Sequence, residues 1–164
     1  GSAAVSAAPV AGAKRPPRIL AWANRGLTRA LDRGRGPTFL RLLTVPGRVS
    51  GEPRTTPIVP VVDGDRVWLV SAYGEVAWVR NLRAAGRVEL RRGDDRRSYR
   101  ARELDAHEAV PVLRTYLSMR TALFVRRRFG VTPDSTDEAI AADAPAHPTF
   151  ELVPAPDDDI PEES

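Results

Sequence analysis

The segment GRVSGEPRTTP, residues 47–57, gathers the residue types that bind an anion. Arg48 and Arg54 supply positive charge, and a serine and two threonines supply hydroxyl groups. The two glycines permit positive φ angles, which can turn backbone N–H groups toward one point. Because guanidinium and hydroxyl groups both donate hydrogen bonds to phosphate oxygens, the segment predicts a phosphate site. The alternative is a solvent-exposed loop with ordinary surface arginines.

Other reactive groups are sparse in this sequence. The chain has no cysteine, which excludes thiolate chemistry and disulfides and favours a reducing, cytoplasmic location. His107 and His147 lie far apart without a metal-ligand spacing, so we predict no metal site. We assign His107 to a helix start and His147 to a loop. The segment is not a Walker loop either, because that motif needs Gly-Lys-Ser/Thr at the start of a helix.

The charge distribution favours an anionic partner. The formal net charge is +4, but five of the 21 acidic residues fall in the last eight positions. The preceding 156 residues therefore carry 25 basic and 16 acidic side chains, a net charge of +9. Nearly all the basic residues are arginine, which also fits a genome with arginine-rich codon usage. No segment has the roughly 18 apolar residues of a membrane span, although the basic amphipathic pattern of residues 18–33 allows peripheral membrane contact.

Hydrophobic periodicity predicts one domain over residues 18–154, between disordered ends at 1–17 (with a Gly-Ser cloning remnant) and 155–164. Asp63-Gly64-Asp65 and Gly93-Asp94-Asp95 predict hairpins, and Pro60 predicts an edge strand or a bulge. Strands joined by hairpins favour an α+β, mainly β fold, a small antiparallel barrel with helices packed outside. We expect helices at 18–33, 77–85 and 105 to about 120, and strands at 38–45, 56–63, 66–72, 87–92, 97–104 and 148–153.

Four motifs occur in consistent order: Gly47-Arg48-x-Ser50-Gly51-x-x-Arg54-Thr55-Thr56-Pro57, Asp63-Gly64-Asp65, Ala77-Trp78-x-x-Asn81-Leu82 and Val88-x-Leu90. Together they resemble the deazaflavin-dependent nitroreductase family. The resemblance spans about residues 39–104, and the strand at Phe150 resembles the family's last strand. It implies a split β-barrel related to FMN-binding oxidases, and reduced coenzyme F420, a 5-deazaflavin, as hydride donor.

The resemblance also implies which residues contact the cofactor. Coenzyme F420 carries a phosphodiester and an oligoglutamate tail, so residues 47–57 would hold its phosphate and Pro57 would start the next strand. Asn81 would fix this loop by hydrogen bonds, and Trp78 would pack beside the cofactor; the alternative makes Trp78 a core residue. The expected cofactor-binding residues are Arg48, Ser50, Gly51, Arg54, Thr55, Thr56, Pro57, Ser71, Ala72, Tyr73, Trp78 and Asn81.

The implied activity is that of an F420H2-dependent reductase acting on a small electron-poor acceptor such as a quinone, an enone or a nitroaromatic. The reduced product needs a proton, and Tyr116, Tyr73 or water would supply it. We take Tyr116 as the candidate donor and expect Tyr116, Leu117, Leu123 and Phe124 to line the acceptor pocket. No protein nucleophile is required.

Three alternatives to this activity stay open at this point. One is an FMN- or FAD-binding split-barrel oxidoreductase, and another is a carrier that binds F420 without turnover. Nucleic-acid binding is disfavoured because the arginines are not interleaved with aromatic residues in a known motif. The sequence is compatible with a monomer and with a homodimer. Val49 departs from the family pattern, which often has lysine there, and so removes one phosphate partner.

Overall fold

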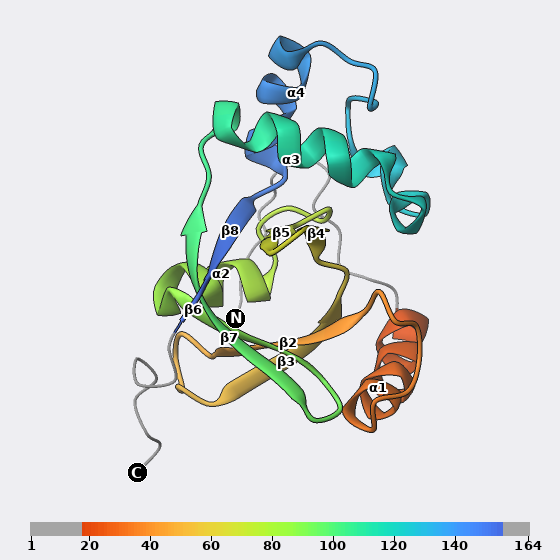
Figure 1. Ribbon diagram of the computed structural model, residues 1–164, viewed down its shortest axis with the longest axis vertical. Helices are drawn as coiled ribbons and strands as arrows, with labels where there is room; N and C mark the ends of the chain where they lie inside the picture. The colour runs from red at the N-terminus through yellow and green to blue at the C-terminus, as the bar shows by residue number, and fades with distance from the viewer. Residues whose placement is uncertain (1–17, 156–164) are drawn as a thin grey trace.

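A computed structural model describes residues 18–155, with side chains from Arg25 onward. Within these residues, seven antiparallel strands form one sheet in the order β3-β2-β6-β7-β8-β5-β4 (Figure 1). The strands are β2 (Arg41–Pro46), β3 (Pro53–Ile58), β4 (Val61–Asp63), β5 (Arg66–Val70), β6 (Arg87–Arg92), β7 (Asp95–Glu103) and β8 (Thr149–Pro154). The helices are α1 (Arg18–Asp32), α2 (Ala77–Ala85), α3 (Ala106–Ser118) and α4 (Asp137–Asp143), with 3₁₀ turns η1 (Arg120–Ala122), η2 (Arg126–Arg128) and η3 (Ala144–Ala146).

The sheet is curled because its two edge strands are neighbours in the chain. β3 and β4 lie at opposite edges of the sheet, yet only Val59 and Pro60 separate them in sequence. The prediction of an edge position near Pro60 is confirmed. The predicted continuous strand 56–63 is wrong, because β3 ends at Ile58 and Pro60 has no N–H for a ladder.

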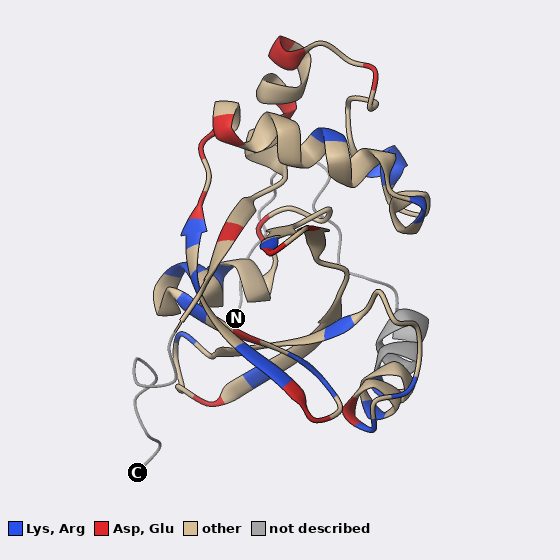
Figure 2. Cartoon of the chain, viewed as in Figure 1, with Lys and Arg blue, Asp and Glu red and all other residues tan. Residues whose placement is uncertain are grey.

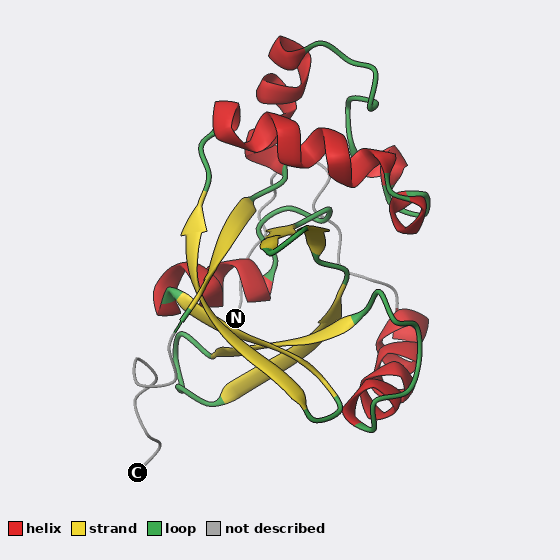
Figure 3. Ribbon diagram, viewed as in Figure 1, coloured by secondary structure: helices red, strands yellow, loops and turns green. Residues whose placement is uncertain are grey.

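The inner face of the curled sheet carries one of two hydrophobic cores. Leu43 and Leu90, from the neighbouring strands β2 and β6, meet Leu69 of the distant strand β5 there, and α2 adds Val79 and Leu82. The outer face carries the second core, where α3 and its neighbours pack on β5 (Figure 3). α1 lies against β2, β3 and β6. The sheet thus lies between the inner core, to which α2 contributes, and the outer core under α3.

The helix ends follow local signals in the sequence. Asp105 caps α3 in a complete capping box with Glu108, as its position predicts. α2 ends at Gly86, whose φ of 69° is in the left-handed region. α3 stops at Ser118 rather than about Arg120, because Met119 adopts an extended backbone. None of the helices within residues 18–155 combines the length and apolar character that a membrane crossing requires.

Most other predicted elements are confirmed to within a few residues. Both two-residue hairpins form, at β4–β5 and at β6–β7. The ends expected to be disordered lie outside the described residues, apart from Ala155, whose N–H donates to the Ser98 carbonyl (3.0 Å).

Candidate functional site

β2 and β3 form a hairpin closed by residues 47–52, and we call residues 47–54 the cationic loop. The Gly47 N–H donates to the Glu52 carbonyl (2.8 Å) and the Gly51 N–H to the Gly47 carbonyl (2.9 Å). Gly51 has a φ of 75°. The prediction that glycine N–H groups point freely at an anion is therefore wrong, because closing the hairpin already uses both.

Asn81 of α2 fixes the first turn of the cationic loop. Its side chain is buried, and its Oδ1 accepts hydrogen bonds from the Arg48 backbone N–H (3.1 Å) and from Arg48 Nη1 (2.8 Å). The hydrogen bonds that we expected between Asn81 and the loop are thus present. One guanidinium donor of Arg48 is engaged, and the others stay available on an exposed side chain.

Other atoms of the loop pack closely against Gly47, where a side chain would not fit without a shift. A Cβ at Gly47 would lie 3.2 Å from both Ser50 Oγ and the Glu52 carbonyl oxygen, and 3.4 Å from Arg54 Nε. Its φ is outside the left-handed region, so close approach rather than backbone strain requires glycine here. Ser50 Oγ accepts from the Glu52 N–H (3.1 Å), which leaves its own hydroxyl proton to donate elsewhere.

The two arginines of the loop contrast with Arg83 of α2, which pairs with two acids. Arg48 and Arg54 are exposed, and neither forms an ion pair within residues 18–155. Arg83, in contrast, binds Glu75 and Glu103 at 2.7 Å each, and the hydrogen bond to Glu103 raises its pKa most. Figure 2 shows further basic residues along β6 and β7. The loop therefore offers guanidinium groups that no described acid neutralises.

Arg54 and Thr56 lie on the inner face of β3. Arg54 pairs with Val45 and Thr56 with Leu43, and both partners are buried in the inner core. Because residues two apart in a strand share a face, Arg54 and Thr56 can serve one ligand.

Thr55 and Pro57 lie on the opposite face of β3. Thr55 Oγ1 is 2.9 Å from Oγ1 of Thr44, its cross-strand partner. The resemblance implies that Ser50, Thr55 and Thr56 share the oxygens of the phosphate, but Thr55 and Thr56 lie on opposite faces of β3 and so do not face one ligand together. The expectation that Pro57 starts the strand is also wrong, because β3 begins at Pro53 and Pro57 lies inside it.

The turn after β5 is held rigidly. The Ser71 hydroxyl donates to the Gly74 carbonyl (2.5 Å), and the Ser71 N–H donates to the Pro148 carbonyl (2.9 Å). Ser71 and Ala72 are buried, and Tyr73 is half-buried. This turn contains the residues that the resemblance places at the deazaflavin ring.

Four rings pack beside this turn, and we call Tyr73, Tyr116, Phe129 and His147 the aromatic cluster. The Tyr116 and Phe129 ring centroids are 5.8 Å apart, and Phe129 stacks on His147 at 3.8 Å. Burial, with a smaller contribution from Tyr73, raises the pKa of Tyr116 to about 12. Tyr116 therefore keeps its hydroxyl proton at neutral pH.

His147 is the residue that sequence reasoning missed. It is 3% exposed, with Nδ1 3.3 Å from the Ser71 carbonyl oxygen and Nε2 3.4 Å from Asp143 Oδ2. Burial lowers the pKa of His147, although Asp143 opposes this shift. A neutral imidazole can donate through Nδ1 to Ser71 and so support the turn. The sequence has no signal for this role, because a single histidine before a strand reads as a loop residue.

The four residues that we expected to line the acceptor pocket do not share one environment. Tyr116 and Leu117 are buried, whereas Leu123 is 56% and Phe124 87% exposed. The prediction that these four side chains line one pocket is wrong, because the helix ends at Ser118 and the chain turns outward.

Trp78 lies on the inner side of the fold. It is half-buried, and its ring centroid is 6.1 Å from that of Phe150. This packing supports the core interpretation of Trp78, while its contact with a cofactor stays a prediction.

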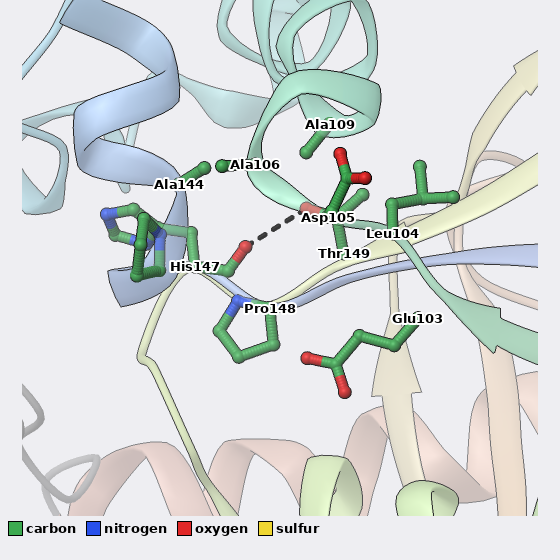
Figure 4. Close-up of a pocket in the computed structure, with 10 residues that line it drawn as sticks. Glu103, Leu104, Asp105, Ala106, Ala109, Ala144, His147, Pro148 and Thr149 are labelled. Carbon is green, nitrogen blue, oxygen red and sulfur yellow. Dashed lines mark hydrogen bonds between the residues drawn. The ribbon is translucent and has the colours of Figure 1, made fainter.

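A small pocket lies where β7 meets α3, η3 and β8 (Figure 4). Its volume is about 70 Å³, and the Thr149 hydroxyl donates to the His147 carbonyl (3.0 Å) at its wall. Sites for ligands of drug size occupy about 300–1,000 Å³. None of the predicted cofactor-binding residues lines this pocket, so we do not assign the cofactor to it.

The family of F420H2-dependent quinone reductases matches residues 23–131. Among solved structures, an F420-H2 dependent reductase (FDR-A) is 20% identical, with 71% of this chain and 95% of that chain covered and a TM-score of 0.52. A structure described as a domain-swapped dimer is 19% identical, with 82% and 99% covered and a TM-score of 0.53. A protein of unknown function from Agrobacterium tumefaciens is 18% identical, with 90% and 59% covered and a TM-score of 0.50. No curated protein matches the chain.

These comparisons confirm the expected fold and cofactor. The solved structures bear on the fold alone, and the curled antiparallel sheet with its helices is the split β-barrel that the sequence predicts. The family match covers 109 of 164 residues and includes the cationic loop, α2 and α3. The chain therefore belongs to the F420H2-dependent quinone reductase family, and it is an oxidoreductase that uses coenzyme F420.

Proposed function

We propose that the cationic loop binds the phosphodiester of F420 and that the protein reduces a quinone. One observation carries the placement of the phosphate. Arg48 and Arg54 are exposed and have no ion-pair partner in the described part of the chain, and Arg54 Nε lies 3.4 Å from the position of a Cβ at Gly47. A phosphate accepts several charge-assisted hydrogen bonds, which this donor set can supply.

The remaining expected contacts follow from the faces of β3. Arg54 and Thr56 share the inner face, so both serve the same ligand together with Ser50 of the loop. Thr55 and Pro57, on the other face, act by shaping the strand and its neighbour β2 rather than by direct contact. Asn81 holds Arg48 in place before the ligand arrives, which lowers the entropy lost on binding.

The turn after β5 is our proposed site for the deazaflavin ring. Ser71 and Ala72 are buried and offer a rigid backbone, and Tyr73 offers the edge of a ring. When bound, reduced F420 supplies the hydride. The chain orients the ring and the acceptor and excludes water between them, and no residue of the chain is needed as a nucleophile.

Tyr116 is our proposed proton donor. Its hydroxyl is protonated at neutral pH, because burial raises its pKa to about 12. Such a weak acid transfers its proton only to an oxygen that has gained negative charge, which a quinone oxygen does on reduction. Tyr73, half-buried beside Tyr116, is the alternative donor. We place this reaction in the cytoplasm, on the absence of cysteine.

Parallel titrations with F420, FMN and FAD, followed by fluorescence, test the proposed function. We expect F420 to bind most tightly and its affinity to fall as salt rises, because the loop contacts an anion. We then expect menadione to oxidise reduced F420 in the presence of catalytic amounts of protein. Retention of FMN through purification would indicate a flavin enzyme instead. Binding of F420 without turnover would indicate a carrier.

A further inference from the structure

The segment between η1 and η2 carries an exposed apolar tip, Leu123 and Phe124. Leu123 is 56% exposed and Phe124 is 87% exposed, and they are adjacent in the chain. Single apolar side chains on a protein surface are ordinary. Two large ones side by side at the outer end of α3, however, indicate a surface that meets something apolar.

The apolar tip is surrounded by positive charge. Residues 109–133 contain five arginines and no acidic residue. Arg120 and Arg127 flank the tip, are exposed, and form no ion pair within residues 18–155. Figure 2 shows basic residues at the end of α3 and in the turns that follow it, and acidic ones only farther on, in the loop that leads to α4. A partner that binds this surface must therefore have both an apolar region and negative charge.

We propose that the apolar tip docks the protein on an anionic lipid surface. Leu123 and Phe124 enter the boundary between headgroups and acyl chains, and Arg120 and Arg127 contact lipid phosphates. Apolar side chains bordered by arginines suit this boundary, since the bilayer accepts the rings and the headgroups accept the charge. A lipid surface needs no shaped groove on the protein, so two exposed apolar side chains are sufficient for docking.

The same segment is anchored to the aromatic cluster. Arg126 Nε donates to the Leu117 carbonyl (2.8 Å), and the Arg128 guanidinium lies 4.8 Å from the centre of the Tyr73 ring. Docking would therefore bring Tyr73 close to the lipid surface in which a quinone dissolves. The idea that the quinone reaches the protein from the lipid rests on the proposed function, whereas the docking itself does not.

Sedimentation of the full chain with lipid vesicles tests the docking. Vesicles of phosphatidylcholine are compared with vesicles that contain about 30% phosphatidylglycerol. We expect binding to the anionic vesicles, and Phe124→Glu should lower the apparent partition coefficient by about tenfold. Arg127→Ser should lower it by about fivefold, the effect of losing one surface cation. Val153→Glu, a half-exposed valine at the far end of β8 from α3, is the matched control and should bind as the wild type does.

Several outcomes would overturn the docking. Absence of binding to anionic vesicles at low salt is one, and equal binding of Phe124→Glu is another, since it would assign binding to the basic helix α1. An equal loss in Val153→Glu would show that the effect is not local. A change of oligomeric state in Phe124→Glu without a change in lipid binding would make the tip an interface between copies. Oxidation of reduced F420 by menadione is measured without vesicles, and so it tests the proposed function independently of lipid binding. Either proposal can therefore fail while the other holds.

Discussion

The ionisable side chains of the cationic loop are exposed and charged, whereas those of the aromatic cluster are at least partly buried and neutral. In the loop, Arg48 and Arg54 keep their charges exposed with no acid of residues 18–155 paired to them. In the cluster, burial lowers the pKa of His147 and raises that of Tyr116, so each shift favours the neutral form. Exposed charge suits an anionic cofactor tail, and buried neutral rings suit an uncharged acceptor and a flat ring. The comparison teaches that one small fold can keep some ionisable groups charged and others neutral, according to whether water reaches them.

The largest effect should come from removing charge from the loop. Arg54→Ala should weaken F420 binding by about 1–3 kcal/mol, the scale of a lost charge-assisted hydrogen bond, and leave stability almost unchanged because Arg54 is exposed. A fluorescence titration measures this. Arg35→Ala is the matched control, since Arg35 is exposed and has no ion-pair partner among the residues that the structure describes. Equal affinities of the two variants would contradict the placement of the phosphate.

A second variant sharpens the comparison by adding charge without changing shape. In Asn81→Asp, the carboxylate still accepts both hydrogen bonds from Arg48, but it neutralises that guanidinium. We expect F420 affinity to fall by about 1–2 kcal/mol, the scale of a unit charge a few ångströms from a phosphate near the surface. Because the new carboxylate is buried, urea unfolding is used to confirm that the variant remains folded under the conditions of the titration. Unchanged affinity would mean that the loop does not face an anion.

The aromatic cluster predicts a pH dependence of stability. Above the unfolded pKa of about 6.5, His147 is neutral in both states and contributes no slope. As pH falls below this value, the unfolded chain takes up a proton that the folded chain resists, because burial lowers the pKa of His147. The free energy of unfolding should therefore fall, by at most about 1.4 kcal/mol per pH unit, until the folded pKa is reached.

Two glutamine variants isolate this dependence. His147→Gln should unfold with a flatter pH profile between about pH 7.5 and pH 5. His107→Gln, which changes an exposed histidine at the start of α3, should keep the wild-type profile. If both variants keep the wild-type profile, then His147 is not held neutral by the fold.

The smallest effect should come from an arginine that the fold already neutralises. Arg83 binds Glu75 and Glu103, but these side chains are each more than a third exposed. Arg83→Ala should therefore cost less than about 1 kcal/mol of stability, since solvent screens such pairs. Its F420 affinity should equal that of the wild type. If Arg83→Ala lost as much F420 affinity as Arg54→Ala, then the presence of an ion-pair partner would not decide which arginines bind F420.

Much of the fold and one part of the site could be predicted from local signals. Asp105, Gly86 and the two Gly-Asp turns mark element ends by backbone chemistry that does not depend on the rest of the chain. Asn81 and the residues of the cationic loop were found together because they form one recognisable motif, although the placement of the phosphate itself stays a prediction.

The remainder depends on long-range packing. Val59 and Pro60 join opposite edges of the sheet, a consequence of curling that no local pattern encodes. The division of Thr55 and Thr56 between faces follows from the register with β2, and the burial of His147 follows from the approach of η3 to the turn after β5. Each requires contacts between residues distant in sequence.

A crystal structure of the protein with bound F420 tests the central claim most directly. The account predicts phosphate oxygens about 3 Å from the guanidinium nitrogens of Arg48 and Arg54, with Asn81 still bonded to Arg48. A bound cofactor whose phosphate lies elsewhere, with both guanidinium groups facing solvent, would contradict it.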